Sequence, residues 1–236
     1  MISVCLTTYN GERFLYEQIF SILNQLSSCD ELIISDDGSN DNTVEIIKSF
    51  DDPRIKFYSN RFGDVIKNFE FTITKSEGNI IFLSDQDDIW VDGKVSSHLS
   101  MYIDDNPQLV LSDYYLINSV GTLLSKKPVK SNYSRSFIIN LIKNNGIGCT
   151  MSFNKRLKDI VLPFPKSIPM HDWWIFLIAI LACRVIYIDS KLTMYRRHDN
   201  NFTKDINSTV FLKLKWRLNL LINIIKRVVR VKFIQN

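Results

Sequence analysis

Three carboxylates lie within four positions of one another, directly after an apolar run, in the segment IIFLSDQDDIW at residues 80–90. An apolar run rich in β-branched and aromatic residues is typical of a strand buried on both faces. Asp85, Asp87 and Asp88 then follow its carboxyl end, which is where open α/β sheets bind ligands. Because like charges this close repel, they indicate either a solvent-exposed acidic turn or a site for a hard divalent cation.

The first ninety residues alternate between strand and helix patterns. The expected strands are 2–8, 31–35, 54–59 and 80–83, and the expected helices are 12–25, 43–50 and 64–76. Such alternation implies parallel strands joined by right-handed crossovers, as in a Rossmann-like sheet. Polar clusters follow three of these strands and would converge on one edge of the sheet. This convergence favours a site over an isolated acidic turn.

The second half is less regular. The expected helices are 92–104, 136–145 and 172–183, the expected strands are 109–118, 146–153, 184–188 and 192–198, and a hairpin with a polar loop is expected at 120–131. Asp172 stands where an N-cap or first-turn acid stabilises a helix. The sequence contains no internal repeat and no low-complexity segment.

The composition suits one large α/β domain, or one domain and a tail. The chain has 236 residues, of which 45% are hydrophobic and 23% charged, enough for a sizeable core. The longest apolar stretch, Trp173–Cys183, is about half of the roughly 20 residues that span a bilayer, and the N-terminus lacks a signal-peptide pattern. Four cysteines without C-x-x-C spacing indicate reduced thiols, as in a cytosolic protein. We therefore expect no transmembrane helix.

The C-terminal segment 206–236 has no acidic residue, and seven lysines and arginines interleave with its apolar residues. One or two helices here would be apolar on one side and basic on the other. Such a helix either lies on an anionic membrane surface or packs on the core with a basic solvated face. We favour the membrane surface. Nucleic acid is not an expected partner, because no nucleic-acid motif accompanies the charge.

Five motifs occur in a fixed order, each where a site loop is expected. They are LTTYNGE at 6–12, SDDGSNDNT at 35–43, DQDDIW at 85–90, HDWW at 171–174 and YRRH at 195–198. Each motif is weak alone, but together they resemble the family-2 glycosyltransferases, and the DQDDIW and HDWW forms look most like the rhamnosyltransferase branch.

The resemblance implies a GT-A fold, an α/β Rossmann-like architecture with a mostly parallel central sheet flanked by helices. Residues 1–205 would form this domain, with a nucleotide-binding half at 1–90 and an acceptor-binding half at 91–205, and 206–236 would be a basic amphipathic tail. The implied activity is inverting, metal-dependent transfer of one sugar per binding event. The donor would be dTDP-rhamnose or a UDP-hexose, and the acceptor a glycan or lipid-linked saccharide of bacterial cell-surface polysaccharide synthesis. The implied location is cytoplasmic, peripheral on the inner face of the membrane.

The resemblance also assigns site residues. The nucleotide-sugar contacts would be Thr7, Tyr9, Asn10, Glu12, Asp37, Lys67, Asp85 and Arg196. Mg²⁺ or Mn²⁺ would be held by Asp87 and His198. Each residue also has a plainer interpretation: Tyr9 as a packed ring, Asp37 as a turn acid, Lys67 as a solvated lysine, His198 as a surface histidine. One arginine of the Arg196–Arg197 pair would then simply pair with an acid.

Asp172 matches the position of the catalytic base, which takes the proton of the acceptor hydroxyl in a single displacement. A base and a first-turn helix acid are compatible roles. The family often has an acid before this aspartate, whereas this chain has His171, whose role stays open. Trp173 and Trp174 would offer a stacking surface to an acceptor sugar, although one of them suits the core. Residues 148–150 would line the acceptor side.

Two other classes compete with this hypothesis. An aspartyl-phosphate phosphatase also has two spaced aspartates after a strand, but here the strand is fourth in order and Ile89-Trp90 follows the acids. A non-catalytic membrane-surface adaptor with a degenerate pocket remains the main alternative. A sugar-nucleotidyltransferase would show a Gly-rich basic loop after the first strand, where this chain has TYNGE.

Overall fold

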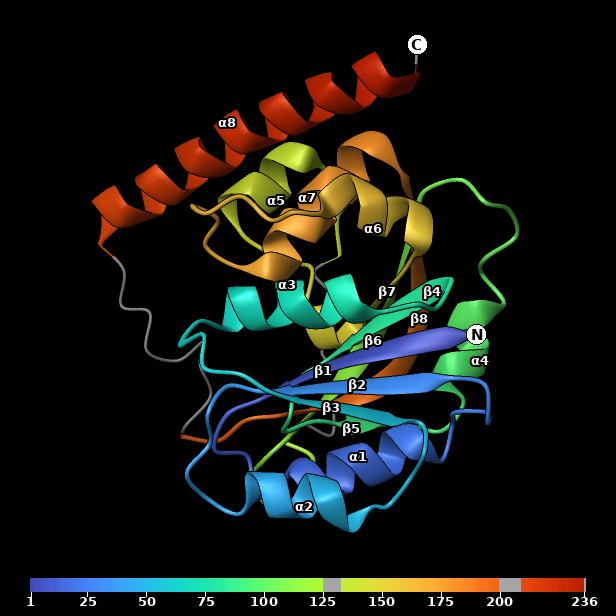
Figure 1. Cartoon of the computed structure of the whole chain (residues 1–236). Coiled ribbons are helices and arrows are strands. Elements are labelled where there is room, and N and C mark those ends of the chain that lie inside the picture. The colour runs from blue at the N-terminus through green and yellow to red at the C-terminus, as the bar shows by residue number, and fades with distance from the viewer. Residues whose placement is uncertain (125–132, 200–208, 236) are drawn as a thin grey trace.

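Eight strands form one mixed sheet in the computed structural model, which describes residues 1–124, 133–199 and 209–235 (Figure 1). The strand order is β3-β2-β1-β4-β7-β6-β8-β5. The first four strands in this order are parallel: β1 (Ile2–Thr8), β2 (Glu31–Asp36), β3 (Ile55–Ser59) and β4 (Ile80–Ser84). The expected Rossmann-like half is confirmed.

The second half extends the sheet beyond β4 with mixed directions. Its strands are β5 (Ile89–Trp90), β6 (Gln108–Ile117), β7 (Met151–Asn154) and β8 (Arg184–Arg196). β7 is antiparallel to β4 and β6, β8 is parallel to β6, and β5 is antiparallel to β8. Four of the seven neighbouring pairs are parallel, so the predicted mostly parallel sheet is confirmed.

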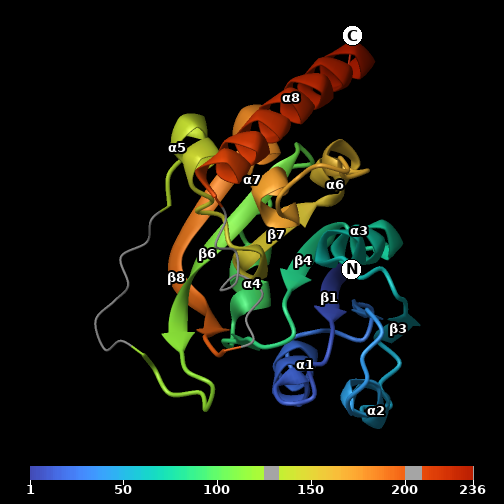
Figure 2. The ribbon, with the colours of Figure 1, turned by 90° about the vertical axis from the view of Figure 1, so that its left-hand side faces the viewer.

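Helices cover both faces of the sheet (Figures 1 and 2). One face carries α1 (Leu15–Leu23), α2 (Thr43–Ser49) and α4 (Lys94–Leu99), and the other carries α3 (Val65–Lys75), α6 (Lys155–Val161) and α7 (His171–Ala182). Outside α7 lie α5 (Phe137–Ile142) and α8 (Val210–Gln235). The sheet therefore sits between two helical layers, with a third layer on one side.

Each face of the sheet has its own apolar core. Val4 and Leu6 of β1 point into the core beneath α1, whereas Cys5 points into the core beneath α3 and α7. Successive side chains of a strand face opposite sides, so a strand between two cores is predominantly apolar on both faces. This explains the apolar residues 4–6 of β1 and the apolar run of β4, whose Ile81 and Phe82 lie in opposite cores. The buried Ser3 of β1 donates to Glu31.

Several elements of the second half differ from those predicted from the sequence. One continuous strand, β8, replaces the two strands expected at 184–188 and 192–198, because β6 pairs with both parts across an irregularity near Asp113. The helix expected at 92–104 is only α4, which starts after Gly93 in a left-handed conformation (φ 83°). Residues 148–150 form a 3₁₀ turn rather than a strand.

Two short elements were not anticipated. The two residues of β5 exist as a strand only through pairing with β8, and α6 follows β7 directly without a turn motif. Of the hairpin expected at 120–131, an isolated bridge between Ile117 and Leu123 is described, and 125–131 lie outside the described residues. Elements this short are decided by tertiary pairing rather than by local propensity.

The C-terminal segment forms a single helix, α8, which begins at Val210. Residues 206–208, the start of the predicted tail, lie outside the described residues. Leu220 and Ile224 of α8 are buried in the core against α7. The helix thus packs on the domain. This agrees with the interpretation in which the segment packs on the core and keeps a basic solvated face. Among the described helices, none combines the length and the apolar character needed to cross a bilayer.

Candidate active site

The carboxyl ends of β1, β2 and β4 meet at one edge of the sheet, because these strands are parallel neighbours. The loops that follow them begin at Tyr9, Asp37 and Asp85. Gln86 joins the first loop to the third: its side chain accepts from the Tyr9 N–H at 2.8 Å and donates to the Tyr9 carbonyl at 3.0 Å. The polar clusters that the sequence placed on one edge therefore do lie together.

Asn10 and Glu12 join the first loop to the second. Asn10 Oδ1 accepts from the Asn40 N–H at 2.9 Å, and Glu12 Oε2 accepts from the backbone and side-chain nitrogens of Asn42 at 3.0 and 2.7 Å. Asn10 has a positive φ of 48°, which asparagine tolerates better than most residues. Both side chains are exposed, and in this structure they hold the loop pair together.

The carboxylate of Asp37 holds the loop between β3 and α3. Its Oδ1 accepts from the backbone N–H groups of Phe62 and Gly63, and its Oδ2 accepts from that of Asp64 at 3.1 Å. A carboxylate anchored by three amides has a fixed orientation. Asp37 therefore shapes this side of the sheet edge whatever ligand the edge accepts.

The other side chains expected to contact the nucleotide sugar differ in their exposure to solvent. Thr7 is buried at the end of β1, whereas the Tyr9 side chain is 57% exposed and Lys67 is exposed on the first turn of α3. Tyr9 and Lys67 are therefore accessible to a ligand at this edge, and Thr7 lies in its floor.

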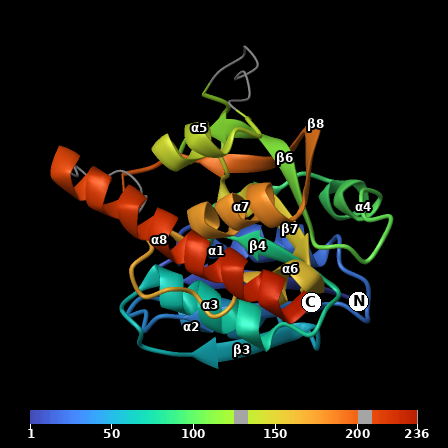
Figure 3. The ribbon, with the colours of Figure 1, turned by 90° about the horizontal axis from the view of Figure 1, so that it is seen from above.

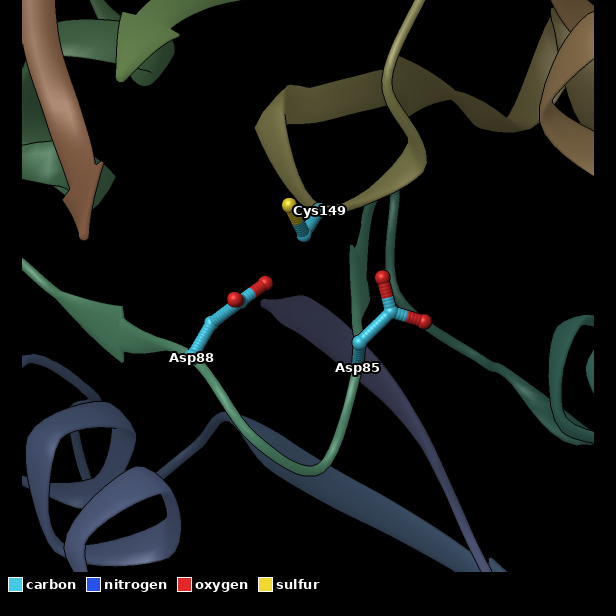
Figure 4. A group of neighbouring side chains, drawn as sticks. All are labelled: Asp85, Asp88 and Cys149. Atoms are coloured by element: carbon cyan, nitrogen blue, oxygen red, sulfur yellow. The ribbon is translucent and has the colours of Figure 1, made fainter. Parts of the chain in front are cut away.

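Asp88 is completely buried at the centre of the acidic loop. Its Oδ1 accepts from the Arg196 backbone N–H at 2.9 Å, and within the described part of the chain its Oδ2 has no hydrogen-bond partner. The weakly donating thiol of Cys149 lies near the same carboxylate. Figure 4 shows Asp85 and Asp88 on the acidic loop with Cys149 opposite them, and one potential ligand atom of each residue lies within 4.8 Å of the others. A buried carboxylate oxygen without a strong donor is a place for a cation.

The charges of the cluster reinforce this conclusion. Burial raises the pKa of Asp85 well above its ordinary value, and the charges of Asp88, Asp87 and Asp172 raise it further. Burial, with the charge of Asp87, raises the pKa of Asp88 to about 7. Lys94 acts in the opposite direction on both but does not offset the acids. The excess of carboxylate oxygens fits a hard divalent cation such as Mg²⁺ or Mn²⁺.

Asp87 and His198 lie side by side although 111 positions separate them. Asp87 Oδ2 is 2.8 Å from His198 Nε2. The imidazole also packs against the ring of Phe14, with the ring centroids 4.8 Å apart. The fold therefore brings together the two residues that the sequence selected as metal ligands.

Arg196 is buried, and its guanidinium faces protein acceptors. It donates to the Asp87 carbonyl at 2.8 Å, to Glu17 Oε2 at 2.6 Å and to the Ser119 carbonyl at 3.3 Å. These bonds link the acidic loop to α1 and to the end of β8. The expected direct contact of Arg196 with phosphate does not suit this geometry, in which Arg196 positions the acidic loop; the neighbouring Arg197 is exposed.

A buried cation, Lys94, lies behind the acidic loop and was missed from the sequence. Its Nζ donates to the Cys149 carbonyl at 2.6 Å and to Thr193 Oγ1 at 2.8 Å, and sits 4.5 Å from the ring centroid of Trp90. Burial lowers its pKa to about 8. A lysine in a short helix is ordinarily solvated, so the only available signal was the crowded acid cluster that precedes it.

Asp172 lies in the first turn of α7, as expected. Its Oδ1 accepts from Asn144 Nδ2 at 3.1 Å and from the Trp173 N–H at 2.6 Å, and its Oδ2 accepts from the Gly148 N–H at 3.2 Å. Burial raises the pKa of Asp172 to about 6, against the effect of these hydrogen bonds. Its charge also raises the pKa of Asp85, so carboxylates from the two halves of the chain converge.

The neighbours of Asp172 belong to the core. His171 is buried with its ring stacked on Phe69 at a centroid distance of 3.8 Å, and burial lowers its pKa to about 3. Trp173 and Trp174 are also buried, and each indole N–H donates to a backbone carbonyl. The prediction that they form a sugar-stacking surface is wrong, because α7 is enclosed by the core on almost every side.

Comparison with known proteins identifies the family. The family model described as Glycosyl transferase family 2 matches residues 3–161, more than half of the chain. The chain belongs to glycosyltransferase family 2. As a family-2 glycosyltransferase it is a sugar-transferring enzyme, which removes the phosphatase and adaptor alternatives. The resemblance stated from the five motifs is confirmed.

Two curated proteins similar to this family-2 glycosyltransferase come from bacteria. The Escherichia coli protein UDP-Glc:alpha-D-GlcNAc-diphosphoundecaprenol beta-1,3-glucosyltransferase WfgD is 29% identical over 226 residues, which cover 92% of this chain and 84% of the relative. The Shigella flexneri dTDP-rhamnosyl transferase RfbG is 30% identical over 236 residues, covering 90% of this chain and 77% of the relative.

Solved structures confirm the GT-A type of fold. Residues 1–349 of S. aureus TarS, in complex with UDP-GlcNAc, superpose with a TM-score of 0.68 at 20% identity, covering 89% of this chain and 61% of TarS 1–349. The mannosyltransferase PcManGT from Pyrobaculum calidifontis, solved with GDP-Man and Mn²⁺, superposes with a TM-score of 0.64 at 14% identity, covering 85% and 58%. The family-2 glycosyltransferase thus spans about three fifths of these solved chains.

Proposed function

We propose that this chain is an inverting, metal-dependent glycosyltransferase of bacterial cell-surface polysaccharide synthesis. It moves a sugar from a nucleoside-diphosphate donor, dTDP-rhamnose or a UDP-hexose, to a glycan or lipid-linked acceptor. One observation carries the proposal: Oδ2 of Asp172, at the start of α7, accepts from the Gly148 N–H, and the thiol of the next residue, Cys149, lies within 4.8 Å of a carboxylate oxygen of Asp85, which follows β4. Donor-holding and proton-accepting carboxylates then face one reaction centre from two halves of the chain.

The donor half comprises residues 1–90. The exposed ring of Tyr9 and the anchored carboxylate of Asp37 lie where the base binds, and Asp85 takes the ribose. Lys67 and the exposed Arg197 supply positive charge for phosphate, and Arg196 acts indirectly by holding the acidic loop. Within residues 1–90, the proposed direct contacts are Thr7, Tyr9, Asn10, Glu12, Asp37, Lys67 and Asp85.

Asp87 and His198 hold the cation, Mg²⁺ or Mn²⁺. The support is their 2.8 Å contact, together with the cluster of Asp85, Asp88 and Cys149 in the same acidic loop and the facing turn, whose potential ligand atoms lie within 4.8 Å of one another. When bound, the cation acts as a Lewis acid on the diphosphate and neutralises its charge. The charge of Asp87 acts on Asp88, whose buried Oδ2 has no hydrogen-bond partner among the described residues, so Asp88 adds to the negative field of this site. Removal of the cation should therefore abolish transfer.

Asp172 is the proposed base, in the acceptor-binding half at 91–205. The acceptor oxygen forms its bond to the anomeric carbon as the bond from that carbon to the diphosphate breaks, and the proton of the acceptor hydroxyl passes to Asp172. This single displacement inverts the anomeric centre. A pKa of about 6 leaves Asp172 mostly ionised at neutral pH yet basic enough to accept a proton. Asn144 and Gly148 orient its two oxygens.

The acceptor is proposed to be lipid-linked, because the name of the E. coli relative specifies a diphosphoundecaprenol acceptor. The protein then works in the cytoplasm as a peripheral protein on the inner face of the cell membrane, and the basic segment 206–236 binds the anionic surface. The name of the S. flexneri relative specifies a dTDP-rhamnosyl donor, which supports dTDP-rhamnose as strongly as the first name supports UDP-glucose.

A donor screen tests the proposal. Binding of UDP-glucose, UDP-GlcNAc and dTDP-rhamnose is measured by thermal shift with and without Mn²⁺, and the donor that binds is assayed for transfer to a polyprenol-diphosphate saccharide. We expect Mn²⁺-dependent binding of one donor and a product of inverted anomeric configuration by NMR. Retained configuration, or full activity in EDTA, contradicts the proposed mechanism.

A further inference from the structure

The outward face of α8 carries an apolar stripe. Six side chains recur every three or four residues and stay largely exposed: Phe211 (78%), Leu214 (60%), Leu218 (58%), Ile222 (41%), Ile225 (55%) and Val229 (48%). This spacing places them on one side of the helix, over a length of about 27 Å at 1.5 Å per residue. The opposite side, with Leu220 and Ile224, is the one buried against the domain. The helix therefore has a second apolar face that the domain does not cover.

The short helix α5 extends this apolar surface. Its Ile138, Ile139 and Ile142 are 68%, 50% and 58% exposed. α5 contacts α8, and Arg217 of α8 donates to the Ile142 carbonyl. Both helices lie on the same outer side of the molecule (Figures 1 and 3). We call these nine exposed residues the α5–α8 platform; an apolar surface of this extent marks an interaction site.

The charges around the platform indicate what covers it. Lys215 and Lys226 are exposed on α8 beside the platform, and the segment 206–236 contains no acid. A second copy of the chain would bring lysines of one α8 against lysines of the other. An anionic lipid surface instead accepts the apolar side chains among its acyl chains and the lysines among its headgroups.

The arginines of α8 have a different role. Arg227 donates to the carbonyls of Ile160 and Leu162 at 2.6 and 2.7 Å, and Arg217 is bound to α5 as described above. These two side chains fasten the helix to the domain. The platform is therefore fixed in orientation relative to the active site.

The platform also connects to the proposed base. Asn140 of α5 accepts the Trp173 indole N–H at 2.6 Å through its carbonyl, and Asn144, two residues beyond Ile142, donates to Asp172. The helix that presents isoleucines to the outside thus also holds the start of α7. A surface bound by α5 lies on the acceptor side of the molecule.

We propose that α5 and α8 together bind an anionic lipid leaflet, and that this platform presents Asp172 to acceptors carried by the same leaflet. The second part rests on the proposed function; lipid binding itself does not depend on catalysis. The sequence directed attention to the tail alone, whereas the structure adds α5. Because Leu220 and Ile224 belong to the core, the test uses outward-facing substitutions in the full chain rather than a truncation.

The test measures binding to phosphatidylcholine vesicles with and without phosphatidylglycerol. Three double variants are compared with the wild type: Ile138→Ser/Ile142→Ser, Leu214→Ser/Leu218→Ser and Lys215→Glu/Lys226→Glu. The matched control is Ile103→Ser, which alters an isoleucine that is 70% exposed but lies in the loop after α4. Melting temperatures check that each variant folds.

We expect each double variant to lose at least about tenfold in affinity for the anionic vesicles, and the control to bind as the wild type does. Binding by the Ile138→Ser/Ile142→Ser variant equal to the wild type overturns the role of α5. Equal binding to neutral vesicles overturns the role of the lysines. A wild-type dimer in solution that the Leu214→Ser/Leu218→Ser variant abolishes overturns the lipid assignment.

The same variants separate this inference from the proposed function. On a soluble acceptor analogue the platform variants should turn over as the wild type does, whereas on vesicle-embedded acceptor they should be slow. Asp172→Asn should bind vesicles normally and be inactive on both acceptors. An active Asp172→Asn refutes the proposed base while leaving the platform intact.

Discussion

The side-chain amide of Asn144 donates a 3.1 Å hydrogen bond to Oδ1 of Asp172. It therefore joins the segment after α5 to the first turn of α7. Gly148 holds the other oxygen of the same carboxylate. Three N–H donors, two of them from the segment 144–148, fix its orientation while burial keeps its pKa near 6. A carboxylate with a fixed direction and a moderately raised pKa suits a general base.

Replacement of Asp172 by Asn should remove the base while preserving the donor site. We expect kcat to fall by about 10²–10⁴-fold, the usual contribution of a positioned base. The affinity for the nucleoside diphosphate, measured by calorimetry, should stay within about twofold of wild type. Asp159→Asn, an exposed acid on α6, serves as the matched control and should keep full activity. Wild-type turnover by Asp172→Asn would exclude this residue as the base.

The pH dependence of turnover should report the pKa of Asp172. The base acts only when ionised, so kcat should rise with pH through about 6 and level off above it. Hydrogen bonds to an ionised carboxylate lower its pKa, so Asn144→Ala should move this acid limb to higher pH. The measurement is the kcat profile between pH 5 and 8 for both proteins. If the acidic side of the kcat profile of Asn144→Ala stays in place or moves to lower pH, the hydrogen bond from Asn144 does not lower the pKa of the base, which contradicts the proposed role of Asn144.

Removal of the proposed metal ligands should weaken the response to metal. Asp87→Ala or His198→Ala should raise the Mn²⁺ concentration for half-maximal activity at least about tenfold. EDTA should abolish activity in the wild type, and added Mn²⁺ should restore it. Asp92→Ala alters an exposed acid just beyond the same loop and should leave the titration unchanged. An unchanged titration in both ligand variants would assign the cation to other residues.

The two neighbouring arginines should differ in their effect on stability. Arg196 is buried and donates to Glu17 and to the Asp87 carbonyl, so Arg196→Met should lower the free energy of unfolding by about 2–4 kcal/mol. Arg197 is exposed, and Arg197→Met should change it by less than about 0.5 kcal/mol. Urea unfolding monitored by tryptophan fluorescence measures both. Equal effects of the two substitutions would refute the bracing role of Arg196.

The donor edge was predictable because its geometry follows from local rules. The apolar run of β4 marked it as a buried strand, and the alternation of strands and helices indicated parallel pairing. Parallel neighbours necessarily end at the same edge. Tyr9, Asp37 and Asp85 were therefore placed together before any contact was known. The motif order supplied the family, which the family model confirms.

The second half was less predictable because its elements depend on distant partners. β5 has two residues and exists through pairing with β8. The sequence predicts a sugar-stacking surface at Trp173 and Trp174 with one of the two in the core, whereas both are buried because neighbours cover α7 on nearly all sides. Lys94 was overlooked because nothing local distinguishes a buried lysine from a solvated one.

By itself the sequence determined the alternation of strands and helices, the edge at which the carboxylates of β4 gather, and the absence of acids in the tail. These properties follow from residue order and from side-chain periodicity. The tertiary structure alone decided that Arg196 supports the acidic loop from within, that Asp172 comes near Asp85, and that α8 has one apolar face against the domain and another exposed alongside α5. Contacts between segments a hundred residues apart depend on how whole layers pack, and residue order does not encode that locally.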